Sequence, residues 1–154
     1  MPNYKGHLVG GLIAYLISLY LVVMYTTWPT IFTAVEWLFF ALVGSLFPDV
    51  DVKSKGQNYF YWFIALLLGY FFVLKRFTMM ATIGVVAVIP QLVRHRGIFH
   101  RIWFITLLPL GLAMILCSYV PRCQTIFLFD AFFFIAGAIS HLWLDLGFKR
   151  MLRG

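Results

Sequence analysis

The stretch LVGGLIAYLISLYLVVMYTT, residues 8–27, decides the fold class, because it runs for twenty residues without a charged side chain. A helix needs about 20 apolar residues to cross the hydrocarbon core of a bilayer. Backbone groups in lipid must be satisfied within their own segment, which favours helices over open strands. Five further apolar stretches follow, at residues 31–47, 59–74, 78–93, 102–120 and 125–146. The sequence therefore predicts an all-α, polytopic membrane protein with about six transmembrane helices in one bundle.

The composition excludes the main alternatives to a membrane protein. Of the 154 residues, 63% are apolar and 11% are charged, whereas a soluble domain has roughly a quarter charged residues. Disordered chains are polar and poor in aromatic residues, and this chain is 19% aromatic. No internal repeat or long linker divides the chain, so residues 1–154 are predicted to form a single integral membrane domain. No sequence feature specifies an oligomeric state.

The basic residues predict the orientation of these spans. Six spans place both termini on one side, and cytoplasmic loops are enriched in Lys and Arg. The side of the termini would carry nine of the twelve basic residues: Lys5, Lys53, Lys55, Arg94, Arg96, Arg101, Lys149, Arg150 and Arg153. The other side would carry three: Lys75, Arg76 and Arg122. Both termini are therefore predicted to be cytoplasmic. The net charge of +7 is assigned to loops and lipid headgroups, and no nucleic-acid partner is expected.

Seven potential metal ligands fall at the predicted cytoplasmic ends of the spans. Ionisable groups at membrane depth are costly and usually face the protein interior. Imidazole suits zinc or iron, and carboxylate suits manganese as well. The seven are all four histidines and three of the five acids: His7, Asp49, Asp51, His95, His100, His141 and Asp145. The pattern predicts a centre for divalent metal, with zinc the first choice and manganese or iron as alternatives.

Each part of this set also has a simpler interpretation. His141 and Asp145 are four residues apart, a spacing that suits either a local hydrogen bond or two ligands on one helix face. Asp49 and Asp51 follow Pro48 and could form a solvated turn. His95 and His100 could belong to a basic interfacial loop. Together, however, the seven exceed the needs of one ion. Two ions bridged by Asp49 or Asp51 would use them, an arrangement typical of phosphoester hydrolysis.

Four short motifs carry a resemblance to a known family: HLVGG at residues 7–11, FPDVD at 47–51, HRGIFH at 95–100 and SHLWLD at 140–145. In this order they resemble the YdjM-like family of bacterial inner-membrane proteins, described as membrane-bound metal-dependent hydrolases. The ligand pattern is more distantly similar to that of zinc-dependent phospholipases C and P1-type nucleases, which are helical multi-zinc phosphoesterases. The resemblance implies a multi-pass protein of the bacterial inner membrane with hydrolase activity.

The predicted reaction is hydrolysis of a phosphoester at the cytoplasmic headgroup level, with a phospholipid or polyprenyl phosphate as substrate. Metal ions lower the pKa of a bound water to about 7, and a carboxylate of Asp49 or Asp51 could act as general base. Arginine forks suit phosphate oxygens. Arg94, Arg96 and Arg101 are therefore candidates for substrate binding, with Arg96 also a catalytic candidate. Their alternative role is that of ordinary positive-inside charges.

Two other functions remain open from the sequence. A carrier or channel for metal ions or protons would need a polar path through both leaflets, and only Glu36 and Asp130 lie toward the outer half. A non-enzymatic membrane protein would bind a structural metal in a closed ligand shell.

Small, aromatic and sulfur-containing residues predict further features of the bundle. Trp28 fits the outer aromatic belt, and Trp103 and Trp143 fit the inner one. Cys117 and Cys123 do not make a disulfide framework or a thiolate metal site. A single disulfide between them at the outer end of the fifth span stays open. Five glycines are expected to let helices approach closely: Gly10, Gly11, Gly44, Gly84 and Gly137.

Overall fold

The computed structural model describes residues 4–26, 28–49, 55–75, 77, 80, 84, 87, 88 and 100–151, and the regular elements in these ranges are all helices. This confirms the predicted all-α class. The chain packs as two compact units. The first comprises Met1–Pro48 and His100–Gly154, and the second comprises Asp49–Phe99.

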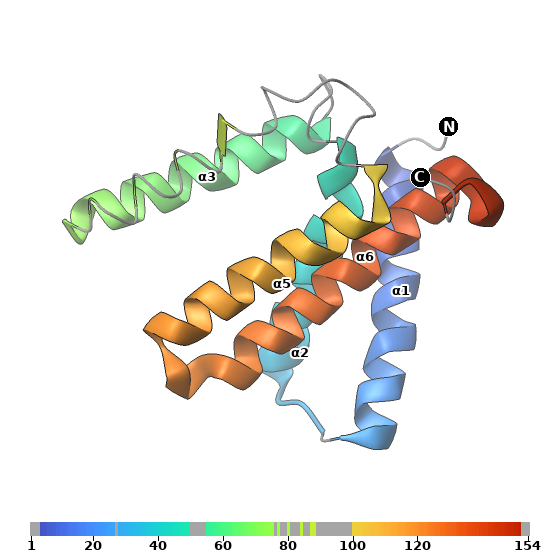
Figure 1. Cartoon of the computed structure of the whole chain (residues 1–154), viewed down its shortest axis with the longest axis horizontal. Helices are drawn as coiled ribbons and strands as arrows, with labels where there is room; N and C mark the ends of the chain where they lie inside the picture. Colours follow the sequence, from blue (N-terminus) through green and yellow to red (C-terminus); the bar gives the residue numbers. More distant parts are fainter. Residues whose placement is uncertain are drawn as a thin grey trace. The chain divides into compact units, whose positions relative to one another are not determined.

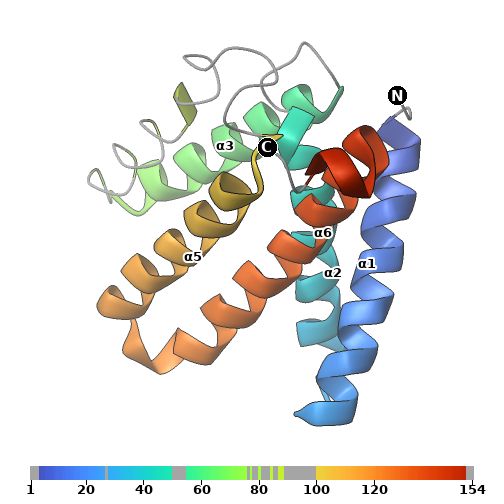
Figure 2. The same cartoon turned by 45° about the vertical axis from the view of Figure 1, so that its right-hand side comes forward.

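The first unit consists of two helical hairpins. Its elements are α1 (Tyr4–Tyr25), α2 (Ile31–Leu46), α5 (Ile102–Tyr119), the 3₁₀ turn η3 (Pro121–Cys123) and α6 (Gln124–Met151). The 3₁₀ turn η1 (Phe47–Asp49) follows α2, and the boundary between the two units falls within it, after Pro48. Thr30 caps α2, its side-chain oxygen accepting a hydrogen bond from the Thr33 N–H at 3.2 Å. Pro121 begins η3, which joins α5 to α6 (Figure 2). Both hairpins therefore return the chain to the end of the unit at which α1 begins.

The four helices match four of the predicted spans in length and apolar character. The spanning segments are Tyr4–Tyr25, Ile31–Asp49, Ile102–Tyr119 and Pro121–Asp145. α1 starts earlier than the apolar stretch because the polar residues before Leu8 continue the same helix. α6 breaks at Gly147, whose φ of 69° lies in the left-handed region that glycine adopts without strain. The straight part of α6 therefore ends just after Asp145.

The second unit contains α3 (Lys55–Val73), which covers most of the predicted third span. Within α3, Tyr61–Val73 is a shorter apolar segment, and polar residues lie in the first turn of the helix. The Tyr61 hydroxyl donates a hydrogen bond to the Ala87 carbonyl at 3.3 Å. The predicted fourth span, residues 78–93, lies almost entirely outside the described residues. Among the described helices, four are long and apolar enough to cross a membrane.

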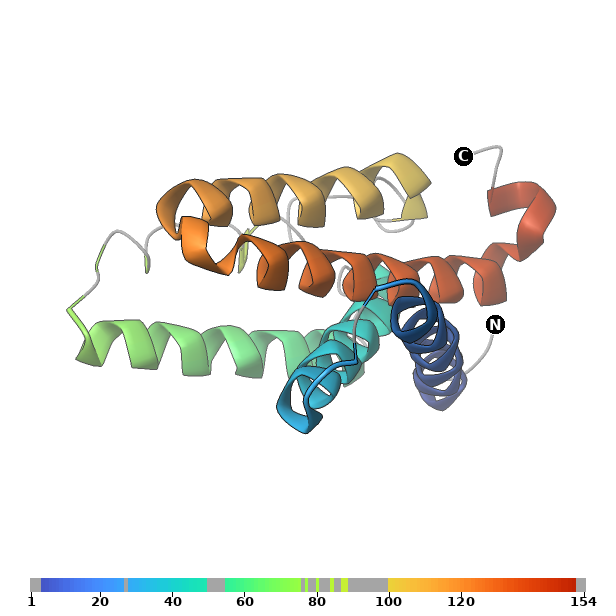
Figure 3. The same cartoon turned by 90° about the horizontal axis from the view of Figure 1, so that it is seen from below.

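Three rows of residues spaced four apart hold α1, α2 and α6 together. Such rows form the ridges by which helices interlock. On α1 the row is His7, Gly11 and Tyr15; on α2 it is Trp37, Ala41 and Ser45; on α6 it is Phe133, Gly137, His141 and Asp145. α6 packs against the other three helices and lies between α5 and the α1–α2 pair (Figure 1 and Figure 3).

Glycines bring the backbones of α2 and α6 into direct contact. A Cβ on Gly137 would overlap the Ala41 carbonyl, and a Cβ on Gly44 would overlap the Phe134 carbonyl. On α1, a Cβ at Gly11 would come within 2.6 Å of the Ser45 side chain. Small residues at crossings are how membrane helices gain close packing. The expectation for glycine therefore holds at these three positions, whereas Gly84 has nothing within 4 Å among the described residues.

Aromatic rings fill the layer nearest the α1–α2 turn. Trp37 stacks on Phe133 with ring centroids 4.8 Å apart, and Tyr15 packs on the same Phe133 ring at 5.7 Å. The Tyr15 hydroxyl donates to the Ala34 carbonyl at 3.0 Å. The outward faces of the helices carry exposed apolar side chains such as Phe32, which is 88% exposed. In a bilayer these faces contact lipid.

Replacing Gly137 by alanine should destabilise the protein, because the new Cβ would meet the Ala41 carbonyl and force α2 and α6 apart. We expect a loss of about 1–3 kcal/mol, the usual cost of overpacking, measured by thermal unfolding in detergent. Gly111→Ala in α5 is the matched control, since none of the described residues lies within 4 Å of a Cβ at that position. Equal stability of the two variants would contradict the close contact.

Candidate metal centre

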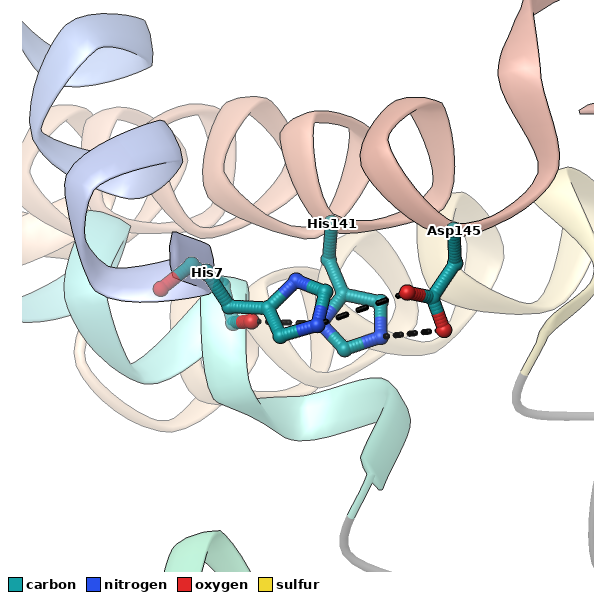
Figure 4. A network of polar contacts seen from close by, with 4 residues as sticks. His7, His141 and Asp145 are labelled. Carbon is teal, nitrogen blue, oxygen red and sulfur yellow. Dashed lines mark hydrogen bonds and ion pairs between the residues drawn. The ribbon is translucent and has the colours of Figure 1, made fainter. Parts of the chain in front are cut away.

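His141 on α6 is oriented by a backbone carbonyl of α2. Its Nδ1–H donates a hydrogen bond to the Ser45 carbonyl oxygen at 2.7 Å. A carbonyl can only accept, so Nδ1 carries a proton, and in the neutral tautomer that has this proton Nε2 carries the lone pair. Figure 4 shows Nε2 directed at Asp145. Metal-binding histidines usually hold their second nitrogen in this way, which fixes the tautomer and the ring orientation.

The local sequence explains why the Ser45 carbonyl is available. Ser45 lies in the last turn of α2, where carbonyls lack partners within the helix. Pro48 has no N–H and cannot continue the α-helical pattern, and the chain passes into the 3₁₀ turn η1 at Phe47–Asp49. The same proline that ends α2 thus helps leave an acceptor for His141.

Asp145 places its two oxygens toward two different imidazoles. Its Oδ2 lies 3.7 Å from His141 Nε2, and its Oδ1 lies 3.4 Å from His7 Nε2. Both separations exceed the usual length of a hydrogen bond. They are close to the roughly 3.4 Å that separates two ligand atoms each about 2.1 Å from a tetrahedral zinc ion. The side chain is only 4% exposed. The separations and the burial together are those expected of a carboxylate that binds a metal ion.

His7 joins this pair from the first turns of α1. Its ring stacks on that of His141, with centroids 3.9 Å apart and an angle of 18° between the planes. His7 is 2% exposed and lies one turn before Gly11, the residue that lets α1 approach Ser45. The position of this histidine therefore depends on the absence of a side chain at Gly11.

Four residues form a group that could hold a metal ion. Asp49, His100, His141 and Asp145 each offer one ligand atom, and these atoms all lie within 4.8 Å of one another. Asp49 ends η1, one peptide bond beyond Pro48, so the end of α2 places it. His100 lies two residues before the start of α5, separated from it by the N-cap residue Arg101, and its ring meets that of His141 edge-on at 5.8 Å. Two imidazoles and two carboxylates fit the donor preferences and coordination number of zinc.

Of the other predicted site residues, the structure describes Arg101 and leaves four outside the described ranges. Arg101 is exposed at the N-cap of α5, directly after His100, and its side chain makes no capping hydrogen bond. Asp51, Arg94, His95 and Arg96 lie outside the described residues. The Ser45 carbonyl was not expected from the sequence, and the signal that could have indicated it is Pro48, three residues later.

Two acids lie apart from this cluster. Glu36 and Asp130 each lie in the second turn of their helices, α2 and α6, at the end opposite the metal-ligand group. Asp130 is buried and Glu36 is exposed. The described packing therefore gathers His7, His100, His141 and Asp145 at one end of the unit and leaves these two acids at the other.

These features define an integral membrane protein of α-helices with a buried histidine–aspartate cluster at one end of its spans. The chain matches the model of the YdjM inner membrane protein family over residues 1–150, and it belongs to that family. The predicted resemblance is thereby confirmed. The comparisons with curated proteins and with solved structures found no match.

Asp145→Asn should lower the affinity for divalent metal, because it weakens a ligand that faces both His7 and His141. Changes to the outer partners of metal ligands already cost roughly 10–100-fold in affinity, so we expect a loss of at least about tenfold. Metal titration of the purified protein measures it. The control is Asp130→Asn, a buried aspartate on the same helix. Unchanged affinity in Asp145→Asn would argue against the site.

Proposed function

We propose that this protein is a membrane-bound, metal-dependent hydrolase that cleaves a phosphoester at the cytoplasmic headgroup level of the bacterial inner membrane. The observation that supports this most is the mixed group of Asp49, His100, His141 and Asp145 at the ends of membrane-spanning helices. Nitrogen and oxygen ligands in this combination suit the metals that hydrolytic enzymes use.

The proposed centre takes two ions, with zinc the first choice. Asp49, His100, His141 and Asp145 would hold one. His7 lies beside Oδ1 of Asp145, the oxygen that does not face His141. Of the described carboxylates, Asp145 is therefore the one best placed to bind both proposed ions. When bound, such ions polarise phosphoryl oxygens and lower the pKa of water. Asp51 and His95 are proposed to complete the ligand set, on the strength of their sequence positions.

The protein's own side chains would bind the substrate and accept a proton from the attacking water. Arg101 lies directly beside His100 in the chain and is exposed, so its guanidinium is available to a phosphate approaching the centre. We assign the same role to Arg94 and Arg96 from their places in the sequence. A carboxylate of Asp49 or Asp51 that is not fully committed to metal would accept the proton from the attacking water.

The depth of the site supports a lipid phosphate as substrate. Tyr25, Trp28 and Phe32 are strongly exposed at the α1–α2 turn, where aromatic side chains favour the membrane interface. His7 lies 18 residues before Tyr25 on α1, or about 27 Å at about 1.5 Å per residue. The hydrocarbon core is about 30 Å thick. The centre would then lie at the opposite interface, at the depth of phospholipid or polyprenyl phosphate groups.

The packing of the first unit favours hydrolysis over transport. Between the metal-ligand group and the α1–α2 turn, α2 and α6 cross at Ala41 and Gly137, where their backbones are in contact. The next layer is the aromatic cluster of Tyr15, Trp37 and Phe133. Transport needs a polar path through both leaflets, and these two layers fill the middle of the three-helix packing with apolar groups.

We further propose six spans with both termini in the cytoplasm. In the first unit, Lys5 and Arg101 lie at the end that holds the metal-ligand group, and Arg122 lies at the other end. A reporter fused at Arg122 should therefore read as periplasmic, and one fused after Gly154 as cytoplasmic. Activity of an alkaline phosphatase reporter at either position measures this. The reverse pattern would place the centre on the periplasmic face.

Purified protein loaded with zinc or manganese should release phosphate or a phosphorylated headgroup from lipid phosphates in mixed micelles. Arg101→Ala should lower turnover by about 10²–10³-fold, the cost of removing one preorganised donor, while metal content stays unchanged. Arg122→Ala, an exposed arginine at the opposite end, is the matched control and should keep full activity. Metal binding without turnover on any lipid phosphate would instead favour a structural metal site.

A further inference from the structure

The two cysteines of the chain both lie at the turn that joins α5 to α6. Cys117 is in the last turn of α5, and Cys123 is the last residue of η3. Both side chains are half-buried. Because the sequence contains two cysteines, any thiol measured on this protein belongs to this pair. The turn is at the end of the first unit opposite the metal-ligand group.

Both cysteines are free thiols in the structure, and the turn at the end of α5 folds the segment after Cys123 back toward Cys117. The Sγ of Cys117 lies 3.8 Å from the carbonyl oxygen of Gln124, the residue that follows Cys123. The N–H of Cys123 donates to the Val120 carbonyl at 3.0 Å, which folds the chain back on the end of α5. The sulfur of Cys117 therefore already reaches the backbone next to Cys123. Disulfides form between residues whose Cα atoms are within about 7 Å.

A disulfide at this turn would stabilise α5, a helix whose hydrogen bonding is interrupted by a proline. α5 packs against α6, through Ile105 against Ala138 and Leu142. Pro109 lies inside α5 and removes one hydrogen bond from the helix interior. The opposite end of α5 begins two residues after His100, a member of the metal-ligand group. Holding the C-terminal end of α5 against α6 would keep the helix aligned along its full length.

We propose that Cys117 and Cys123 form an intramolecular disulfide on the periplasmic side of the membrane. This inference rests on the proposed orientation, because the periplasm is oxidising and the cytoplasm keeps thiols reduced. One thiolate attacks the disulfide of a thiol oxidant, and the second thiolate then displaces the oxidant from the mixed disulfide. The cysteine pair loses two protons and two electrons, and the oxidant leaves as a dithiol.

The test counts reactive thiols in cells. Cells are quenched with acid, and denatured protein is treated with a maleimide polymer that adds visible mass to each free thiol. Wild-type protein should show no added mass before reduction and two additions after it, on a monomer band. Cys117→Ser and Cys123→Ser should each show one addition without reductant. Two additions on unreduced wild-type protein, or a band of doubled mass, would overturn the proposal.

A second arm separates a wrong pairing from a wrong orientation. Purified wild-type protein is reduced and then exposed to oxidised glutathione. Ready pairing in this arm, combined with free thiols in cells, would retain the geometry and reject the periplasmic placement. Failure to pair in vitro would reject the geometry itself. Neither readout depends on metal binding or hydrolysis, so the result is independent of the proposed reaction.

Discussion

The backbone contact between α2 and α6 is the constraint on which the candidate site depends. Gly137 meets the Ala41 carbonyl, and one turn further along each helix stand His141 and Ser45. The hydrogen bond from His141 to Ser45 can form at 2.7 Å only because the two backbones are already touching. A further turn brings Asp145 into the cluster. A side chain at Gly137 would therefore disturb the site one and two turns away.

Burying the charged group of the histidine–aspartate cluster lowers the stability of the fold unless neighbouring groups compensate its charge. Buried carboxylates in a membrane protein pay a large desolvation penalty, and Asp145 is almost completely enclosed. Its Oδ1 is buried and accepts no hydrogen bond from the described residues. A divalent ion would supply the positive charge that this carboxylate lacks. Metal binding would thus contribute to stability as well as to chemistry, since any ligand that binds only the folded state stabilises it.

Much of the fold follows from the length of the apolar stretches. The spans of α1, α2, α5 and α6 were predicted to within a few residues, because a helix must satisfy its backbone wherever it meets lipid. The pairing of His141 with Asp145 was predictable from their spacing of four. His7 was placed in the same ligand set, but its stacking on the His141 ring was not predicted, because it depends on how closely α1 packs against Ser45 at Gly11. Pro48 indicates that a carbonyl is available at the end of α2, but the pairing of the Ser45 carbonyl with His141 arises from packing between helices, which local sequence does not encode.

The central claim is that packing of α1, α2 and α6 assembles a metal centre at one end of the spans. The most direct measurement is an anomalous difference map from crystals of the zinc-loaded protein, recorded at the zinc absorption edge. The expected result is a peak between His141 and Asp145, with nitrogen and oxygen ligands at roughly 2.0–2.2 Å. A map with no peak at this position, or with zinc held only by Cys117 and Cys123, would contradict the claim.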